Sequence, residues 1–324
     1  MVINHPIYII REVSFMKTAF LFSGQGDQTV GMGKDFYENF ECAEKVFNEA
    51  DEALGFSIRD IAFNNKEELD KTENTQPAIL TMSIAALRIL EEKGIKADYV
   101  AGLSLGEYSA LVASGVFDFK EAVQLVTKRG KFMAEAVPNG VGGMCAILGL
   151  EDSEVEAACE EASSIGCVSA VNYNAPGQLV ISGENAAVDK AAEICKEKGA
   201  KMTVKLTVSG PFHTKLLKPA SDKLGVELAK MQVNEMNIPV VSNVTGNIIE
   251  NKEDIVPLLT KQVMNPVKWK QSIELLGELG VDTFIEIGPG RSLSGFVKRI
   301  LKNVTIINVK DMKSLENALK KLEK

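Results

Sequence analysis

Histidine is scarce in this sequence, which contains only His5 and His213 among its 324 residues. Zinc sites are usually built from several imidazole and thiolate ligands, so we expect no metal site of this kind. The five cysteines are odd in number and include no C-x-x-C pair, which favours free thiols in a cytoplasmic protein. A basic excess is also missing, because 36 lysines and arginines stand against 44 acidic residues. We therefore do not expect nucleic acid as a partner.

Long apolar segments are missing as well. A membrane-spanning helix needs about 18 or more apolar residues in a row, and the longest candidate, 101–117, is interrupted by Glu107. Residues 1–15 have neither the basic start nor the cleavage site of a signal peptide. We interpret residues 1–15 as an N-terminal extension of a protein that has no membrane partner and whose functional part begins at Met16.

The rest of the sequence has a globular composition, with 45% hydrophobic and 25% charged residues, and its patterns predict two structural units. Residues 16–138 and 209–324 alternate short apolar runs with helical patterns, including a buried helix at 76–90, and finish with a helix and a strand. This alternation predicts an α/β unit. Residues 139–208 instead predict the order β-α-β-β-α-β, which is typical of a small ferredoxin-like domain.

Ser104 lies in the pattern G-x-S-x-G at residues 102–106, between a short predicted strand and a helix of small residues. A sharp turn there would strain the serine and expose its hydroxyl, and the flanking glycines would let strand and helix approach. The backbone N–H of Leu105 would point to the same place from the positive end of the helix, where it can stabilise an oxyanion. The pattern also occurs by chance, but this context favours a serine nucleophile.

A serine nucleophile needs a base, and His213 follows a predicted strand in the body of the protein. A single histidine is more often packed or exposed than catalytic, yet no other imidazole is available there. No acidic residue lies close to His213 in the sequence, so the third member of a triad stays open.

Two further features have more than one interpretation. The loop 24–28 begins like the dinucleotide pattern G-x-G-x-x-G, but Thr29 stands where the third glycine is needed. The loop is either a tight turn or, as we favour, a second source of an oxyanion-binding N–H. Arg129 is either a solvated charge or a bidentate partner for a substrate carboxylate, and its spacing does not decide between them.

Seven short segments share one order along the chain: GQGDQ (24–28), TQPA (75–78), GLSLGEY (102–108), RG (129–130), GPFH (210–213), NPVKW (265–269) and IGPG (287–290). Together they resemble the family of malonyl-CoA:acyl carrier protein transacylases, from Met16 to the C-terminus. The resemblance implies an α/β-hydrolase-like large subdomain into which the ferredoxin-like small subdomain is inserted. It also implies malonyl-CoA and acyl carrier protein as partners, and we expect a monomer without cofactor or metal.

The resemblance further implies catalytic roles. Ser104 would take malonyl from coenzyme A as an ester and pass it to the phosphopantetheine thiol of acyl carrier protein, with His213 as the base. The backbone N–H groups of Gln25 and Leu105 would form the oxyanion hole. The main-chain carbonyl of Gln262 would orient the histidine, which would replace the missing acid.

Substrate contacts follow from the same resemblance. Arg129 would bind the malonyl carboxylate, Gln76 would line the pocket, and Phe212 would crowd an α-methyl group, which favours malonyl over methylmalonyl. One departure concerns Leu103, because many members of the family carry histidine before the nucleophile. Leu103 cannot act as a second base, which puts any role of that neighbouring histidine in doubt here.

Other functions fit parts of the same pattern. A serine esterase or thioesterase would use the same turn and let water resolve the ester. A non-catalytic module that binds the carrier would keep the fold without the chemistry. An acidic carrier protein would dock on basic residues near the cleft, for which the candidates are Lys196, Lys198, Lys201, Lys298 and Arg299. The carrier would serve fatty acid synthesis, with polyketide synthesis as the alternative.

Overall fold

The computed structural model describes residues 16–138, 140–208 and 210–322. The expected N-terminal extension, residues 1–15, lies outside the described residues. The elements before residue 139 are β1 (Thr18–Phe22), α1 (Lys34–Asn39), α2 (Glu41–Leu54), α3 (Ile58–Asn64), α4 (Lys66–Leu69), α5 (Thr72–Glu92), β2 (Tyr99–Gly102), α6 (Gly106–Ala113) and α7 (Phe119–Ala136).

The elements between residues 140 and 208 are β3 (Gly142–Leu148), α8 (Asp152–Ala162), β4 (Val168–Ala175), β5 (Gln178–Glu184), α9 (Asn185–Glu197) and β6 (Met202–Lys205). Those from residue 210 onward are η1 (Lys215–Leu217), α10 (Lys218–Leu228), β7 (Val240–Val241), η2 (Lys252–Asp254), α11 (Ile255–Gln262), α12 (Trp269–Glu278), β8 (Thr283–Ile287), α13 (Ser292–Ile300), β9 (Thr305–Val309) and α14 (Met312–Leu322). Among the helices in these described ranges, none is long and apolar enough to cross a membrane.

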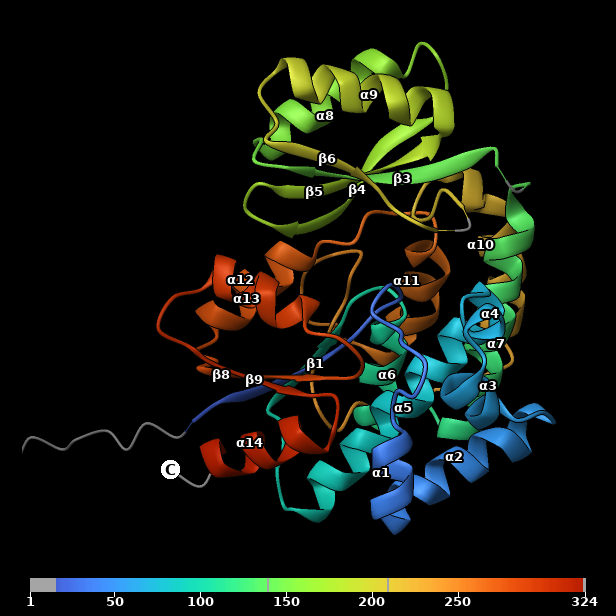
Figure 1. Cartoon of the computed structure of the whole chain (residues 1–324), viewed down its shortest axis with the longest axis vertical. Coiled ribbons are helices and arrows are strands. Elements are labelled where there is room, and N and C mark those ends of the chain that lie inside the picture. The colour runs from blue at the N-terminus through green and yellow to red at the C-terminus, as the bar shows by residue number, and fades with distance from the viewer. Residues whose placement is uncertain (1–15, 139, 209, 323–324) are drawn as a thin grey trace, which may run out of the picture.

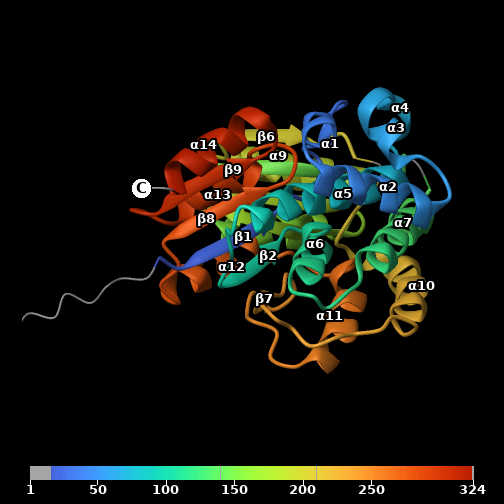
Figure 2. The same ribbon diagram turned by 90° about the horizontal axis from the view of Figure 1, so that it is seen from below.

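A parallel sheet of five strands, in the order β7-β2-β1-β8-β9, forms the centre of the larger unit (Figure 2). The central strand β1 is buried along its whole length. Phe20 and Phe22 pack on one face with α2, α5 and α7, whereas Ala19 and Leu21 pack on the other with α12 and α13. Burial on both faces explains why this strand is a continuous apolar run in the sequence.

A separate antiparallel sheet of four strands, in the order β4-β5-β3-β6, lies above the larger unit (Figure 1). Helices α8 and α9 cover its outer face and share a small apolar core with it. On the inner face, Met144, Ala146 and Val180 join the apolar core of the larger unit instead. Backbone bonds also tie the two units together, because Val267 donates to Val171 at 2.7 Å and accepts from Tyr173 at 3.0 Å. The inner face of the small sheet therefore covers the larger unit.

The structure confirms a mixed α/β fold and differs from the predicted elements in two places. The buried helix predicted to begin at Gln76 begins at Thr72, so that Pro77 lies inside α5 instead of at its start. The chain also does not finish with a helix and a strand, because α14 follows β9 and packs Leu315 and Ala318 into the main core.

The turn between β2 and α6 depends on two glycines that bring backbones into close contact. A Cβ atom on Gly106 would lie 2.1 Å from the carbonyl oxygen of Phe22. A Cβ atom on Gly102 would lie 2.0 Å from the carbonyl group of Gly106. Only glycine fits both places, so the start of α6 can lie directly against the end of β1.

We expect Gly106→Ala to destabilise the protein by about 1–3 kcal/mol, because backbone atoms must move to accommodate the methyl group. Gly295→Ala is a matched control within helix α13, since a Cβ atom there meets nothing within 4 Å. Alanine at this helical position should instead stabilise by about 0.5–1 kcal/mol. Urea unfolding of the two variants measures both values, and equal midpoints would contradict the close-contact explanation.

Candidate active site

Ser104 stands at the turn between β2 and α6 with a φ of 53°. This left-handed conformation strains a residue that has a side chain, and it costs about 1–3 kcal/mol. The turn lies at the carboxyl end of the parallel strands, beside the loop that follows β1. Ligands of open α/β sheets bind at this end of the strands.

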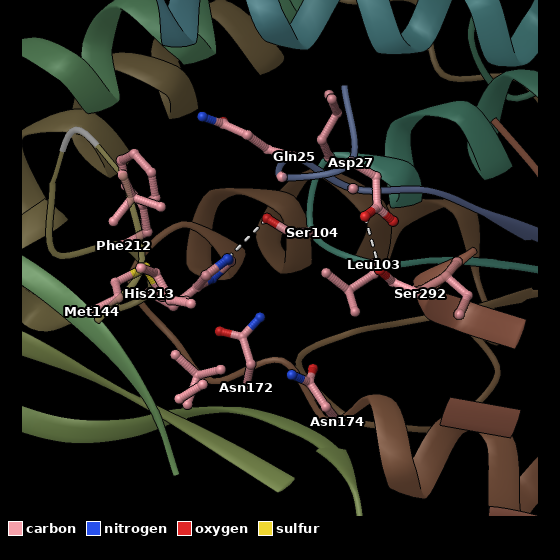
Figure 3. A pocket seen from close by; sticks show the side chains of 18 of the residues that line it. Gln25, Asp27, Leu103, Ser104, Met144, Asn172, Asn174, Phe212, His213 and Ser292 are labelled. Atoms are coloured by element: carbon pink, nitrogen blue, oxygen red, sulfur yellow. Dashed lines mark hydrogen bonds between the residues drawn. The ribbon is translucent and has the colours of Figure 1, made fainter. Parts of the chain in front are cut away.

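A cavity of about 290 Å³ opens over this turn (Figure 3). Its lining combines residues of the larger unit with residues of the inner face of the small sheet: Gly24, Gln25, Gly26, Asp27, Leu103, Ser104, Leu105, Arg129, Met133, Met144, Ala146, Asn172, Asn174, Gln178, Val180, Leu206, Val208, Phe212, His213, Ser292, Leu293 and Phe296. The cavity therefore lies between the two sheets, with Ser104 on its floor.

His213 lies next to the serine, with 2.8 Å between its Nε2 and Ser104 Oγ. Its Nδ1 lies 2.9 Å from the carbonyl oxygen of Gln262 and 3.1 Å from that of Asn265. Carbonyl oxygens only accept, so the neutral ring carries its proton on Nδ1 and leaves Nε2 free to accept from the serine hydroxyl. The structure thus places two main-chain carbonyls where a triad would have an acid. Gln262 was expected at this place from the family resemblance, whereas Asn265 was not.

The pKa of His213 is lowered to about 4, first by burial and then by the positive charge of Arg129. The two carbonyl groups at Nδ1 oppose this shift but do not cancel it. The imidazole is therefore neutral at pH 7, which is the form that can take a proton from Ser104.

Arg129 is not a solvated charge, because its side chain is 1% exposed. Its guanidinium donates from Nη1 to Gln76 Oε1 at 2.8 Å, and from Nη2 to Gln262 Oε1 at 2.9 Å and to Ser104 Oγ at 3.2 Å. The ring of Tyr108 lies below it, with its centroid 5.2 Å from Cζ. Among the residues that the structure describes, no carboxylate forms an ion pair with this guanidinium, and its Nε has no acceptor. The buried carboxyl of Glu107 attracts this charge without contacting it, and an anion in the cavity would compensate the buried cation directly.

The backbone N–H groups of Gln25 and Leu105, both in the cavity lining, donate to no acceptor among the described residues. Gln25 belongs to the loop after β1, and Leu105 precedes the first residue of α6. Free N–H groups beside a nucleophile can receive the negative oxygen of a tetrahedral intermediate.

The remaining candidates lie at different depths. Phe212 and Leu103 line the cavity, whereas Gln76 lies behind Arg129 and is absent from the lining. Gln76 was expected to line the pocket; the structure instead places it where it holds the guanidinium. Asn172 and Asn174 were missed; the predicted strand stopped at Tyr173, whereas β4 includes both asparagines, two residues apart.

The asparagines Asn172 and Asn174 point into the cavity from β4 (Figure 3). They are 9% and 7% exposed, and the Oδ1 atom of each is buried without a hydrogen-bond partner. Such orphaned oxygens are available to N–H donors of a ligand. Over the described residues, no cluster of three or more His, Cys, Asp or Glu side chains is arranged to hold a metal ion.

Comparison with known proteins identifies the family of the chain. Residues 19–320 match the model of the acyl transferase domain family. The chain belongs to this family. Among its relatives are the malonyl CoA-acyl carrier protein transacylases of Bacillus subtilis, 47% identical over 95% of this chain and 98% of theirs, and of Escherichia coli K12, 47% identical over 93% and 98%. The resemblance inferred from the seven segments is confirmed.

Solved structures of the family are equally similar. The malonyl CoA-acyl carrier protein transacylase of Clostridium perfringens superposes with a TM-score of 0.92 at 52% identity, covering 95% of this chain and 97% of that one. A malonyl-transacylase in complex with its type II PKS acyl-carrier protein superposes with a TM-score of 0.92 at 45% identity, covering 94% and 99%. The chain therefore shares the fold of the family over nearly its whole length.

The lowered pKa of His213 predicts an acid-tolerant nucleophile. The rate at which a fluorophosphonate labels Ser104 should stay high down to about pH 5 and fall as the imidazole takes up a proton near pH 4. In Arg129→Ala the loss of the neighbouring positive charge raises the pKa of His213, so the fall should begin at a higher pH. Circular dichroism at each pH controls for unfolding.

Glu107 also titrates near this network, because burial raises its pKa to about 7. The substitution Glu107→Gln removes the titration of this carboxyl, so that it no longer contributes to the pH dependence of the labelling rate. A parent midpoint near the ordinary histidine value of about 6.5, unchanged in Arg129→Ala, would contradict the electrostatic account of His213.

Proposed function

We propose that this acyltransferase moves malonyl from malonyl-CoA to the phosphopantetheine thiol of acyl carrier protein, through an ester on Ser104. The observation that carries the proposal is Arg129, a buried cation that forms no ion-pair contact with a carboxylate of the described residues and that donates to the nucleophile itself at 3.2 Å. A substrate acyl group that ends in a carboxylate supplies the missing anion within reach of the serine.

The first half-reaction follows from the geometry. His213 Nε2 takes the hydroxyl proton while Ser104 Oγ attacks the thioester carbonyl carbon, and the backbone N–H groups of Gln25 and Leu105 stabilise the oxyanion. Collapse of the intermediate breaks the carbon–sulfur bond. The departing thiolate takes the proton from Nε2 and leaves as free coenzyme A. The ester on Ser104 and neutral His213 remain.

The second half-reaction reverses these steps with a new thiol. His213 takes the proton of the phosphopantetheine thiol, sulfur attacks the ester, and Ser104 Oγ regains the proton as it leaves. No atom changes oxidation state in either half-reaction, and the base and the oxyanion donors come from the protein, so the scheme as written calls on no cofactor or metal.

Selectivity follows from charge and space. An acetyl group leaves the guanidinium of Arg129 unpaired, which disfavours its transfer because the site is built for a charged group. Phe212, next to the base in the cavity wall, crowds an α-methyl group and favours malonyl over methylmalonyl. The orphaned oxygens of Asn172 and Asn174 can accept from the amide N–H groups of the pantetheine arm.

Several wider assignments accompany the proposal. The protein acts as a cytoplasmic monomer that supplies fatty acid elongation, and an acidic carrier docks on exposed basic residues, for which the candidates are Lys196, Lys198, Lys201, Lys298 and Arg299. Lys196 and Lys198 were expected near the cleft, but they lie at the end of α9, on the outer face of the small sheet (Figure 1). Arg299 already bridges to β5, where it donates to Gln178 Oε1 at 2.6 Å.

Residues 16–138 and 209–324 form an α/β-hydrolase-like subdomain, and residues 139–208 form a ferredoxin-like subdomain. The strand order β4-β5-β3-β6 supports the second name.

Intact mass spectrometry tests the proposal. Brief incubation with malonyl-CoA should add one malonyl group to the parent protein, none to Ser104→Ala, and far less acetyl should be added from acetyl-CoA. Addition of holo acyl carrier protein should move the label to the carrier. Rapid release of free malonate without transfer would instead favour a serine thioesterase, and a folded protein that neither fluorophosphonate nor malonyl-CoA labels would favour a non-catalytic carrier-binding module.

A further inference from the structure

The strained backbone of Ser104 is held from both sides by side chains distant in the sequence. Its N–H donates to Asn243 Oδ1 at 2.6 Å, and its carbonyl oxygen accepts from Gln262 Nε2 at 2.9 Å. Neither contact belongs to the strand before the serine or to the helix after it. A positive φ of 53° persists only where the surrounding structure fixes it. The side-chain amides of Asn243 and Gln262 hold the peptide groups on the two sides of Ser104.

The side chain of Asn243 contacts a second residue of the turn besides Ser104. Its Nδ2 donates to the carbonyl oxygen of Gly102 at 2.7 Å, so one amide group spans the turn from residue 102 to residue 104. The asparagine is 1% exposed and follows β7, the edge strand beside β2. Its own backbone is fixed as well, because its carbonyl accepts from Lys268 N at 2.9 Å. Every polar group of Asn243 is therefore engaged, and its side chain has one orientation.

The two amides that hold Ser104 converge on one carboxylate. Glu107, three residues after the serine, accepts from Gln262 Nε2 at 2.6 Å and from the backbone N–H of Asn243 at 3.3 Å. Glu107 is 1% exposed and lies in the first turn of α6. The nucleophile and the carboxylate that orients its two supports thus belong to the same short segment.

We propose that Asn243 is a positioning residue for the nucleophile. It does not line the cavity and so does not contact substrate. It fixes the Gly102–Ser104 turn in the conformation that keeps Oγ at 2.8 Å from His213 Nε2. The inference rests on the proposed function only in taking Ser104 as the nucleophile, since no substrate group enters it.

Removal of the amide should slow chemistry and leave substrate binding unchanged. In Asn243→Ala the turn relaxes and Oγ loses its alignment, so fluorophosphonate labelling and kcat with malonyl-CoA should fall on the order of 10- to 100-fold. The KM for malonyl-CoA should stay within about threefold of the parent, because Arg129 and the cavity walls are untouched. Asn243→Asp, which keeps an acceptor for Ser104 N–H and loses the donor to Gly102, should label at an intermediate rate.

Asn308→Ala is the matched control. Asn308 is also an asparagine whose Nδ2 donates to a main-chain carbonyl, that of Gly290 at 2.9 Å, but it lies on β9 at the opposite edge of the sheet from β7. Asn308 is half-buried and its side chain makes this one hydrogen bond, so Asn308→Ala should lose less stability than Asn243→Ala and keep the parent labelling rate.

Two results would overturn the proposal. One is labelling of both Asn243 variants within about twofold of the control, since the turn would then keep its shape without the amide. The other is a loss of labelling that only matches the unfolded fraction measured by circular dichroism. If Asn243→Ala does not fold, the labelling rate of Asn243→Asp is compared with that of Asn308→Ala instead. Fluorophosphonate has no carboxylate, so labelling reports on Ser104 even if malonyl transfer itself fails.

Discussion

The buried charge of Arg129 is the constraint on which the chemistry of this site depends. The guanidinium is surrounded by the neutral oxygens of Gln76, Gln262 and Ser104, and no carboxylate among the described residues forms an ion pair with it. Its positive charge is therefore only partly compensated, and it adds to burial, the larger cause, in lowering the pKa of His213. In the proposed function this cation prepares the cavity for an anionic acyl group, while burial and the arginine charge together keep His213 neutral at pH 7.

The fold supplies this arrangement by bringing distant segments to one end of a parallel sheet. The serine comes from the turn after β2, the free N–H of Gln25 from the loop after β1, and the arginine from α7, a helix that packs against α5. The small antiparallel sheet completes the cavity from the other side with its inner face (Figure 1). Glycines at 102 and 106 permit the close approach of backbones on which the turn depends, and long-range hydrogen bonds fix the result.

Much of this site could be predicted from the sequence because its signals are local. The pattern around Ser104 depends on the steric needs of one turn, and the scarcity of histidine left His213 as the only imidazole in the body of the chain. The supports of the serine carry no such signal. In the sequence, Asn243 and Glu107 are ordinary polar residues that lie 139 and 3 residues after Ser104. Only the folded sheet brings Asn243 into contact with the serine. The inward placement of Gln76 behind the arginine likewise depends on how α5 and α7 pack. The start of α5 was misplaced because the prediction followed the continuous apolar run from Gln76, whereas the helix begins at Thr72 with polar residues.

The selectivity of Arg129→Ala tests the central claim most directly. The ratio of kcat/KM for malonyl-CoA to that for acetyl-CoA should fall on the order of 100-fold, through loss of malonyl transfer, because the carboxylate loses its charge-assisted partner. Arg88→Ala controls for the loss of an arginine, since Arg88 pairs with Glu91 on the outside of α5. An unchanged ratio in Arg129→Ala would contradict the account, because the buried cation would then play no part in choosing the substrate.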